Sequence, residues 1–281
     1  MSLFCDLHMH STFSDGTDTP TRLLELAEEE GLGAIALTDH NTVAGLPEFL
    51  AAAEKKTVRA VAGTEFSAVY KGTELHILGL FLKPEHFDTV TELLEDYHRR
   101  KDQSNRDLVD KLRTAGYMID YDEVKNSTPE GQVNRALIAA ELTRKGYVES
   151  IQAAFKQLLS PKCGYYTPPE RFSPFKIIRF IKSLGAVAVL AHPFLNLKEA
   201  ELREFLTEAV PCGLDAMETM YSTYDEETTR LAEQVADAFQ LLRSGGSDYH
   251  GANKPHIRMG VGQGNLEIPC TFLENMEKCT K

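Results

Sequence analysis

The stretch DLHMHSTFSDG, residues 6–16, decides how this chain is interpreted. Residues 3–10 form an apolar run that is typical of a β-strand, and the side chains of a strand alternate between its two faces. Asp6, His8 and His10 therefore share one face, where two imidazoles can hold the same ion. Asp15 follows in a Ser-Asp-Gly turn. The opening strand thus predicts a metal site.

Further acid and imidazole groups recur along the chain, and most of them follow a short apolar run. Six of the nine histidines belong to such groups. Each group alone has an ordinary explanation, such as a solvated loop glutamate or a hydrogen-bonded core histidine. A chance origin of all of them would require metal-capable side chains at most strand ends, so a shared metal site is favoured. The additional members are Asp39, His40, Glu65, His76, His192, Asp248 and His250. Three histidines outside the groups are expected at the surface: His86, His98 and His256.

Two of these groups carry a stronger local signal than the others. His192 ends a run, residues 186–191, that is so apolar that it should be buried, and a buried imidazole needs a partner. Asp248 and His250 follow Gly245 and Gly246, which are expected to permit the backbone turn that directs both side chains inward.

The apolar runs alternate with helical patterns, which predicts a mainly parallel sheet. Polar groups after many separate strands favour a closed or nearly closed barrel, because a barrel gathers its active site on the rim formed by the strand ends. An open, doubly wound sheet would concentrate ligands at one or two switch points and is the second choice. The expected strands are residues 3–10, 34–37, 58–62, 75–81, 186–191, 214–219 and 241–243. The expected helices between them are residues 20–31, 46–55, 175–184 and 225–238.

The pattern changes between residues 83 and 172. A long charged stretch, residues 87–115, repeats apolar side chains at helical spacing, and residues 133–145 and 148–159 are expected to form two more helices. The predicted organisation is therefore a metal-binding barrel, residues 1–82 and 173–281, with a helical insertion, residues 83–172, that caps the site.

Composition narrows the class of protein. The 281 residues are 42% hydrophobic and 26% charged, without a run long enough to span a bilayer and without a signal-peptide pattern. The five cysteines show no CxxC spacing, which favours reduced thiols in a cytoplasmic protein over a sulfur-ligated zinc site. The net charge of −12 argues against binding of long duplex nucleic acid. It does not exclude an anionic substrate, because bound ions would dominate the local field.

The motifs DLHMHSTFSDG (6–16), TDHN (38–41), GTEFS (63–67), HILG (76–79), AHP (191–193) and GSDYHG (246–251) together resemble the PHP family, the polymerase and histidinol phosphatase superfamily. The resemblance implies an α/β fold, a distorted (β/α)7 barrel, with two or three divalent ions, manganese being favoured and iron or zinc being alternatives. It implies three ligand sets. They are His8, His10, Glu65 and Asp248 for one ion, Glu65, His76 and His192 for a second, and Asp15, His40 and His250 for a third.

Stand-alone family members with a helical insertion at this point look most similar. They resemble phosphatases of nucleoside 3′,5′-bisphosphates and 5′-to-3′ exonucleases acting on short RNA. In that subgroup an arginine at the position of Arg135 and a basic residue near Lys162 contact phosphate. Asn134 and Lys101 are expected to contact phosphate as well, with Arg106 as a further candidate. The expected partner is therefore a small phosphorylated substrate, a nucleotide or short RNA.

The ligand types suggest a reaction. A hydroxide held by two ions is nucleophilic near neutral pH and would attack phosphorus in line. Glu65, Asp248, His192 and His250 are the expected catalytic residues, and Asp6 and Asp39 are expected to orient ligand imidazoles. The acid for the leaving alcohol stays open between a metal-bound water, His192 and His250.

Three other functions are also compatible with these motifs. The chain could be a histidinol-phosphate phosphatase, with the same ions and a different pocket. It could be an amidohydrolase-type barrel that cleaves C–N bonds, since those barrels also begin with His-x-His. It could be a non-catalytic metal-binding module that docks on a polymerase.

Overall fold

The computed structural model describes residues 4–126 and 133–280, which form two compact units. The barrel unit comprises Met1–Thr91 and Arg171–Lys281, and the helical unit comprises Glu92–Glu170. The chain passes from the first unit to the second within helix α3 (Phe87–Thr114) and returns after Glu170. No helix of the described ranges is long and apolar enough to cross a membrane.

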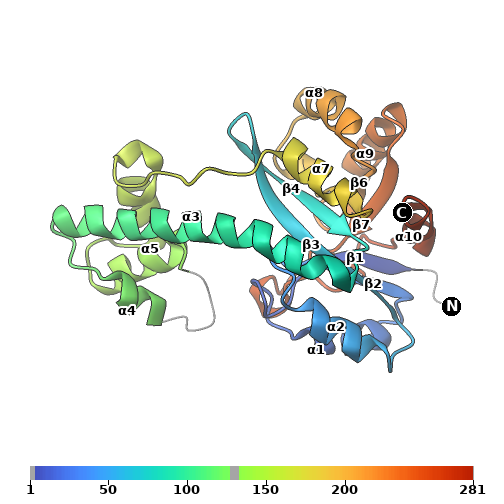
Figure 1. Cartoon of the computed structure of the whole chain (residues 1–281), viewed down its shortest axis with the longest axis horizontal. Helices are drawn as coiled ribbons and strands as arrows, with labels where there is room; N and C mark the ends of the chain where they lie inside the picture. The colour runs from blue at the N-terminus through green and yellow to red at the C-terminus, as the bar shows by residue number, and fades with distance from the viewer. Residues whose placement is uncertain (1–3, 127–132, 281) are drawn as a thin grey trace. The chain divides into compact units, whose positions relative to one another are not determined.

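The barrel unit is built on one seven-stranded sheet whose strands follow each other in sequence order (Figure 1). The strands are β1 (Cys5–Met9), β2 (Ala34–Leu37), β3 (Arg59–Tyr70), β4 (Thr73–Leu80), β5 (Val187–Leu190), β6 (Ala216–Tyr221) and β7 (Leu242–Gly246). The expected strand 3–10 is observed over Cys5–Met9, and residue 3 lies outside the described ranges.

The two ends of the sheet meet, so the sheet is nearly closed into a barrel. The N–H of Asp248 donates to the carbonyl of His8 at 2.9 Å, and the N–H of His10 donates to the carbonyl of Tyr249 at 2.9 Å. Gly246 makes this approach possible, because a Cβ there would lie 2.1 Å from the Cβ of His8. The expected α/β barrel is confirmed, and the open doubly wound sheet is excluded.

Strand β4 runs antiparallel to both β3 and β5, while the other neighbouring strands are parallel. The parallel strands deliver side chains to the active rim at their carboxyl ends. Because β4 runs the other way, it reaches the same rim at its beginning. This reversal explains how His76, near the start of β4, joins residues that follow other strands.

Strand β3 is longer than the sequence pattern indicated. Residues 58–62 were expected to form the strand and to deliver Glu65 beyond its end, whereas β3 continues through Glu65 to Tyr70. The extension pairs with β4 from Gly63 opposite Leu80 to Tyr70 opposite Thr73, so a hairpin partner stabilises residues that the pattern left in a loop.

Helices pack against the strands of the barrel unit. They are α1 (Pro20–Glu29), α2 (Leu46–Ala53), α7 (Pro174–Ser183), α8 (Glu199–Ala209), α9 (Glu226–Ala238) and α10 (Cys270–Glu277). In Figure 1, α1 and α2 lie on one side of the strands, and α7, α8 and α9 lie on the other. Thr19 caps α1 by accepting from the N–H of Arg22, as the Thr-Pro signal predicts. Helices α8 and α10 were not assigned from sequence.

Small and branched apolar side chains fill the barrel interior, and α10 adds Leu273 and Met276 to the same cluster. Such a packed interior leaves the rim, where polar side chains gather, as the place for a site. The buried strand residues of this cluster are Cys5, Leu7, Ala34, Ala36, Val61, Leu78, Leu80, Val187, Val189 and Ala216.

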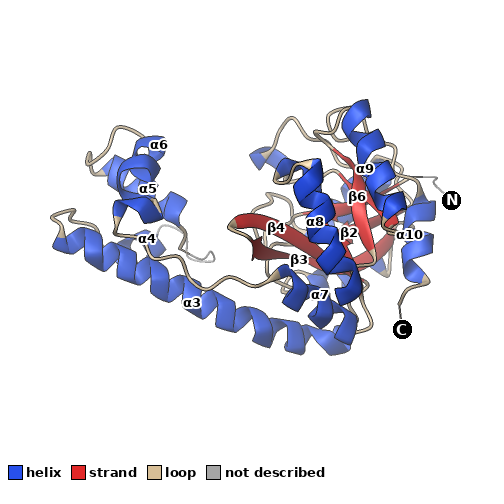
Figure 2. Cartoon of the chain, turned by 90° about the horizontal axis from the view of Figure 1, so that it is seen from above, coloured by secondary structure: helices blue, strands red, loops and turns tan. Residues whose placement is uncertain are grey.

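The helical unit packs around its own apolar core (Figure 2). Besides α3 it contains α4 (Tyr121–Asn126), α5 (Arg135–Arg144) and α6 (Ile151–Ala154), which continues as a π-helical turn over Phe155–Leu159. The expected helices 133–145 and 148–159 correspond to α5 and to α6 with its π turn, and α4 was not assigned from sequence. The core includes Leu108, Leu112, Ile138, Leu142 and Leu159, each fully buried.

Candidate metal centre

The carboxylate of Glu65 lies among five imidazoles. Its side chain is buried in the barrel unit, and ring nitrogens approach both of its oxygens. The distances to Oε2 are 3.2 Å from His8 Nε2, 3.2 Å from His10 Nε2 and 3.0 Å from His40 Nδ1. The distances to Oε1 are 2.8 Å from His76 Nδ1 and 3.1 Å from His192 Nε2. One carboxylate thus connects five imidazoles from four different parts of the chain.

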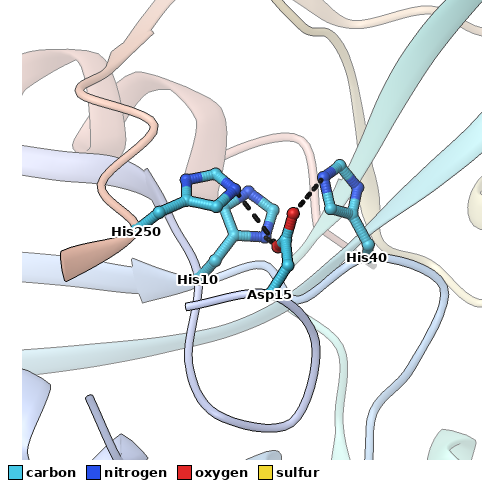
Figure 3. A group of neighbouring side chains, drawn as sticks. All are labelled: His10, Asp15, His40 and His250. Carbon is cyan, nitrogen blue, oxygen red and sulfur yellow. Dashed lines mark ion pairs between the residues drawn. The ribbon is translucent and has the colours of Figure 1, made fainter. Parts of the chain in front are cut away.

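Two further carboxylates extend this cluster. Asp248 Oδ1 lies 3.3 Å from His10 Nε2 and 3.4 Å from His250 Nδ1. Asp15 Oδ1 lies 3.1 Å from His250 Nε2, and Asp15 Oδ2 lies 3.9 Å from His40 Nε2. Figure 3 shows the three imidazoles gathered around Asp15. All nine residues expected as metal ligands therefore lie in one continuous cluster of the barrel unit.

Strand ends and one bulge bring these side chains together. The β1–β2 register shifts between Asp6 and Met9, and such bulges re-aim side chains near active sites. Among the residues that follow strands, Asn41 beside His40 adopts a positive φ of 50°, His192 one of 27° and Asp248 one of 58°. Each such conformation costs about 1–3 kcal/mol in a non-glycine residue, and this kind of strain is typical of functional sites.

The expectation that Gly245 and Gly246 permit the backbone turn was therefore wrong. Gly246 has no positive φ and serves the close approach to His8, whereas the turn itself occurs at Asp248.

The donor set fits divalent cations. Ligand atoms of His8, His10 and Glu65 lie within 4.8 Å of one another, and two overlapping groups have the same property: His40, Glu65 and His76, and His10, Asp15, His40 and His250. Buried nitrogen and oxygen atoms of this cluster have no hydrogen-bond partner despite their short separations: His8 Nε2, His10 Nε2, His40 Nδ1, His76 Nδ1, His192 Nδ1 and Glu65 Oε2. Buried polar atoms are normally satisfied, so unpartnered atoms that converge indicate a place for cations.

Hydrogen bonds also select the imidazole nitrogens that face the cluster. His8 Nδ1 lies 3.0 Å from Glu218 Oε1, which holds Nε2 toward Glu65 as the nitrogen available to a cation. His250 Nδ1 donates to the carbonyl oxygen of Asp248 at 2.8 Å, so Nε2 is the nitrogen that faces Asp15.

Burial and neighbouring charges shift the pKa values of these groups. Burial alone would lower the pKa of His76, but the negative charge of Glu65 outweighs it and raises that pKa to about 10. Burial opposes the charged form of Glu65, yet the neighbouring charges of His40 and His8 hold its pKa well below the usual range. Burial, reinforced by the charge of His40, lowers the pKa of His10. Positive charge in this pocket is therefore favoured by its carboxylates.

Glu218 was missed by the sequence analysis. Glu218 is a fully buried residue of β6. Its Oε1 atom lies 3.0 Å from His8 Nδ1, and its Oε2 atom accepts from the N–H of His192 at 2.7 Å. A carboxylate that holds a ligand imidazole in one tautomer and orientation is a common second layer of a metal site. The signal in the sequence was an acid inside an apolar strand, since an unpaired charge there is costly.

The expectation that Asp6 and Asp39 orient imidazoles was wrong. Asp6 accepts from the backbone N–H groups of Ser247 at 2.9 Å and Gly260 at 2.8 Å. Asp39 accepts from the hydroxyls of Ser11 and Ser14, both at 2.6 Å. Both carboxylates therefore hold loops at the rim in place, because backbone and hydroxyl donors were nearer than any imidazole.

Two more side chains contact the cluster and were not expected. The Oδ2 atom of Asp248 accepts from the hydroxyl of Tyr221 at 2.7 Å and from Lys254 Nζ at 2.7 Å. Neither residue belongs to a sequence motif of the histidine-and-acid kind.

The residues expected to bind substrate phosphate all belong to the helical unit: Lys101, Asn134, Arg135 and Lys162. Asn134 caps α5, its side-chain oxygen accepting from the N–H of Leu137 at 3.0 Å. The guanidinium carbon of Arg135 lies 4.4 Å from the centroid of the Tyr166 ring, and Nη1 donates to the carbonyl of Leu159 at 3.3 Å. Lys162 is exposed.

Arg106, the further candidate for phosphate binding, is already engaged. It is ion-paired with Asp102 at 2.8 Å and lies over the ring of Tyr121. Of the three isolated histidines, His256 is exposed as expected, while His86 and His98 are half-buried.

Comparison with known proteins places the chain in a family. The PHP domain model matches residues 6–162, more than half of the 281 residues. A 5′-3′ exoribonuclease of Haemophilus influenzae is 32% identical, covering 87% of this chain and 89% of the relative. A phosphoribosyl 1,2-cyclic phosphate 1,2-diphosphodiesterase of Eggerthella lenta is 30% identical, covering 91% and 98%. A 3′,5′-nucleoside bisphosphate phosphatase of Chromobacterium violaceum is 27% identical, covering 87% and 86%.

A solved structure agrees with these relatives. A putative metal-dependent phosphoesterase of Bifidobacterium adolescentis superimposes with a TM-score of 0.77 at 27% identity, covering 100% of this chain and 98% of the other. The chain belongs to the PHP domain family. The expected class, a phosphoric ester hydrolase with a histidine and carboxylate cluster able to bind metal, is confirmed.

Proposed function

We propose that this protein is a metal-dependent phosphoesterase that releases phosphate from a small phosphorylated nucleotide, either a nucleoside 3′,5′-bisphosphate, a molecule like AMP, or the 5′ end of a short RNA. One observation carries the proposal: six imidazoles and three carboxylates converge on the barrel rim with unpartnered, buried ligand atoms. Relatives over most of the chain act on an RNA, a cyclic phosphate and a bisphosphate, as their names state.

The nine clustered residues are proposed to hold two or three divalent ions, with manganese as the native ion and iron or zinc as alternatives that suit the same donors. Ions bound there would supply a nucleophilic water near neutral pH and neutralise charge on the phosphoryl oxygens. Glu65 would help to hold ions on both sides of the cluster, because each of its oxygens faces a different group of imidazoles. Asp248, His192 and His250 are proposed to complete the catalytic set.

The helical unit is proposed to cap the site and to bind the phosphate of the substrate. Arg135 supports this proposal, because its guanidinium is held against Tyr166 and Phe155 while Nη1 donates to the carbonyl of Leu159. A planar guanidinium held in this way is suited to phosphate oxygens. Asn134 at the start of α5, exposed Lys162 and Lys101 are the other proposed contacts.

A second candidate activity has its own support. The diphosphodiesterase from Eggerthella lenta matches 98% of its own length to this chain. Opening of a ribose 1,2-cyclic phosphate would require the same nucleophile and the same ions as a phosphatase, so only the substrate pocket would differ.

The experiment is a phosphate-release panel on manganese-loaded protein. It compares adenosine 3′,5′-bisphosphate, AMP, short 5′-phosphorylated RNA, histidinol phosphate, phosphoribosyl 1,2-cyclic phosphate with a coupled phosphatase, and a set of amides. We expect turnover of the bisphosphate or the RNA at least about 100-fold above AMP, because a second phosphate adds charge-assisted hydrogen bonds. Turnover of amides without any phosphoester would refute the proposal.

His8→Ala should abolish turnover in that panel and lower the manganese content. His256→Ala removes an exposed imidazole outside the cluster and serves as the matched control. Equal losses in both variants would remove His8 from the site.

Arg135→Ala should raise KM about tenfold or more and change kcat less, because it removes charge-assisted hydrogen bonds to phosphate. Arg135→Lys retains the charge without the planar guanidinium, so its KM should lie between those of the wild type and Arg135→Ala. Arg144→Ala, which removes a surface ion pair of the same helix, is the control. Wild-type kinetics in Arg135→Ala would exclude this residue from phosphate binding.

A further inference from the structure

The two oxygens of Asp248 have different surroundings. Oδ1 faces the histidines of the cluster, 3.3 Å from His10 Nε2. Oδ2 faces away from it and accepts from two donors at 2.7 Å each, the hydroxyl of Tyr221 and the ammonium of Lys254. The two donors differ in accessibility. Tyr221 is buried, whereas the Lys254 side chain is 34% exposed.

Lys254 is held at the edge of the cluster by its backbone. It follows a short turn, Gly251–Asn253, in which the N–H of Ala252 donates to Thr17 Oγ1 at 2.8 Å. The side chain of Asn253 donates to the carbonyl of Asp15 at 2.8 Å. The segment that carries Lys254 is therefore tied to the loop that carries Asp15, another member of the cluster.

Satisfying Asp248 does not require a positive charge. The Tyr221 hydroxyl already donates to Oδ2 at 2.7 Å. A lysine beside a metal-binding carboxylate weakens cation binding there, because it competes for the carboxylate and repels the ion. Such a charge is useful where an anion arrives.

From this geometry we propose that Lys254 is a substrate-binding residue. Its ammonium contacts a phosphate oxygen of the substrate at the edge of the metal cluster while one of its three N–H groups remains on Asp248. The proposal rests on the proposed function, since it assigns a phosphate ligand to the same site. It gives the barrel unit its own phosphate contact, independent of Arg135 and Lys162 in the helical unit.

The test compares the two donors to the same oxygen. Manganese-loaded wild-type protein, Lys254→Met, Lys254→Arg and Tyr221→Phe are titrated with inorganic phosphate by calorimetry, and their manganese affinities are measured separately. Lys254→Met should bind phosphate about tenfold more weakly, because one charge-assisted hydrogen bond is lost. Its manganese affinity should equal or exceed that of the wild type. Lys254→Arg should stay within about threefold of wild-type phosphate affinity, since the charge is kept.

Tyr221→Phe should show the opposite pattern, with weaker manganese binding and unchanged phosphate affinity once the ions are loaded. Lys278→Met removes an exposed lysine that follows α10 and should change neither quantity. Wild-type phosphate affinity in Lys254→Met would overturn the proposal, as would a loss of manganese parallel to that of Tyr221→Phe, or absence of phosphate binding by the loaded wild type. A wild type that binds phosphate through Lys254 but hydrolyses no phosphoester would refute the proposed function alone.

Discussion

The barrel unit and the helical unit bury polar groups in opposite ways. In the described part of the helical unit, the buried polar side chains are Ser104 and Asn105, and each donates to a backbone carbonyl. The barrel unit buries four histidines, three aspartates and two glutamates at the strand ends as well as within strands: His8, His10, His192, His250, Asp6, Asp39, Asp248, Glu65 and Glu218. Several of their atoms lack a hydrogen-bond partner.

This difference shows where the fold accepts an energetic cost. A buried polar atom without a partner costs about 1–3 kcal/mol. The helical unit avoids that cost in its described residues, and its charges form surface ion pairs such as Arg106 with Asp102. The barrel unit concentrates it at one end of the sheet, which is expected where cations and substrate supply the missing interactions.

Neutralising the carboxylate at the centre of the cluster should have the largest effect on turnover. Glu65→Gln keeps the shape of the side chain but loses the charge that faces five imidazoles, so turnover should fall at least about 1000-fold and manganese content should drop. Glu277→Gln, which removes a surface ion pair with Arg59, is the control. Turnover within tenfold of wild type in Glu65→Gln would contradict a functional role for the unpartnered atoms.

A change in the helical core should separate stability from metal binding. Leu142 is fully buried in that core, and Leu142→Ala should lower the free energy of unfolding of the helical unit by about 3 kcal/mol through the cavity it leaves. Manganese content should stay at the wild-type value. Urea unfolding by circular dichroism measures the first effect. Met118→Ala, at a side chain that is 64% exposed, should cost less than about 0.5 kcal/mol. Loss of manganese in Leu142→Ala would show that the two units are not independent in this respect.

Removing the charge behind His8 should have a smaller effect than removing Glu65. Glu218→Gln can still accept hydrogen bonds but no longer favours a strongly basic imidazole, so manganese affinity should fall about 10- to 100-fold. Competition with a chelator measures it. Glu208→Gln, whose carboxylate accepts from the Tyr70 hydroxyl elsewhere in the barrel unit, is the control. Unchanged affinity in Glu218→Gln would reduce this residue to a packing role.

The smallest expected effect concerns pH. The pKa of His76 is raised to about 10 and that of His40 is raised as well, because the charge of Glu65 outweighs burial. In the metal-free protein the His76 imidazole is protonated at neutral pH and the charged form of His40 is favoured, so a metal must displace protons. Affinity should therefore rise with pH, by about threefold per displaced proton between pH 7.0 and 7.5. Calorimetry in buffers of different ionisation enthalpy counts the protons, and binding without proton release would contradict the raised pKa values.

Much of the site could be predicted because its chemistry repeats at a structural period. Asp15, His40 and His250 each follow a short apolar run, so a barrel with a polar rim was enough to place them near one another. His76 could be grouped with them only by its residue type, since the pattern gave no reason to expect an antiparallel strand. For Glu218 the signal was an acid within an apolar strand, which does not reveal its partners, because they lie at positions 8 and 192.

The order of amino acids was sufficient for the class of fold and for the identity of the donor atoms, since strand periodicity and residue chemistry are local properties. Only the closed sheet brings these donor atoms together. It also places Glu218, Tyr221 and Lys254 behind them, and it brings Asp6 and Asp39 to the loops that they hold. Those contacts join residues that are often more than 200 positions apart, such as Asp6 with Ser247, and no local pattern encodes which donor lies nearest.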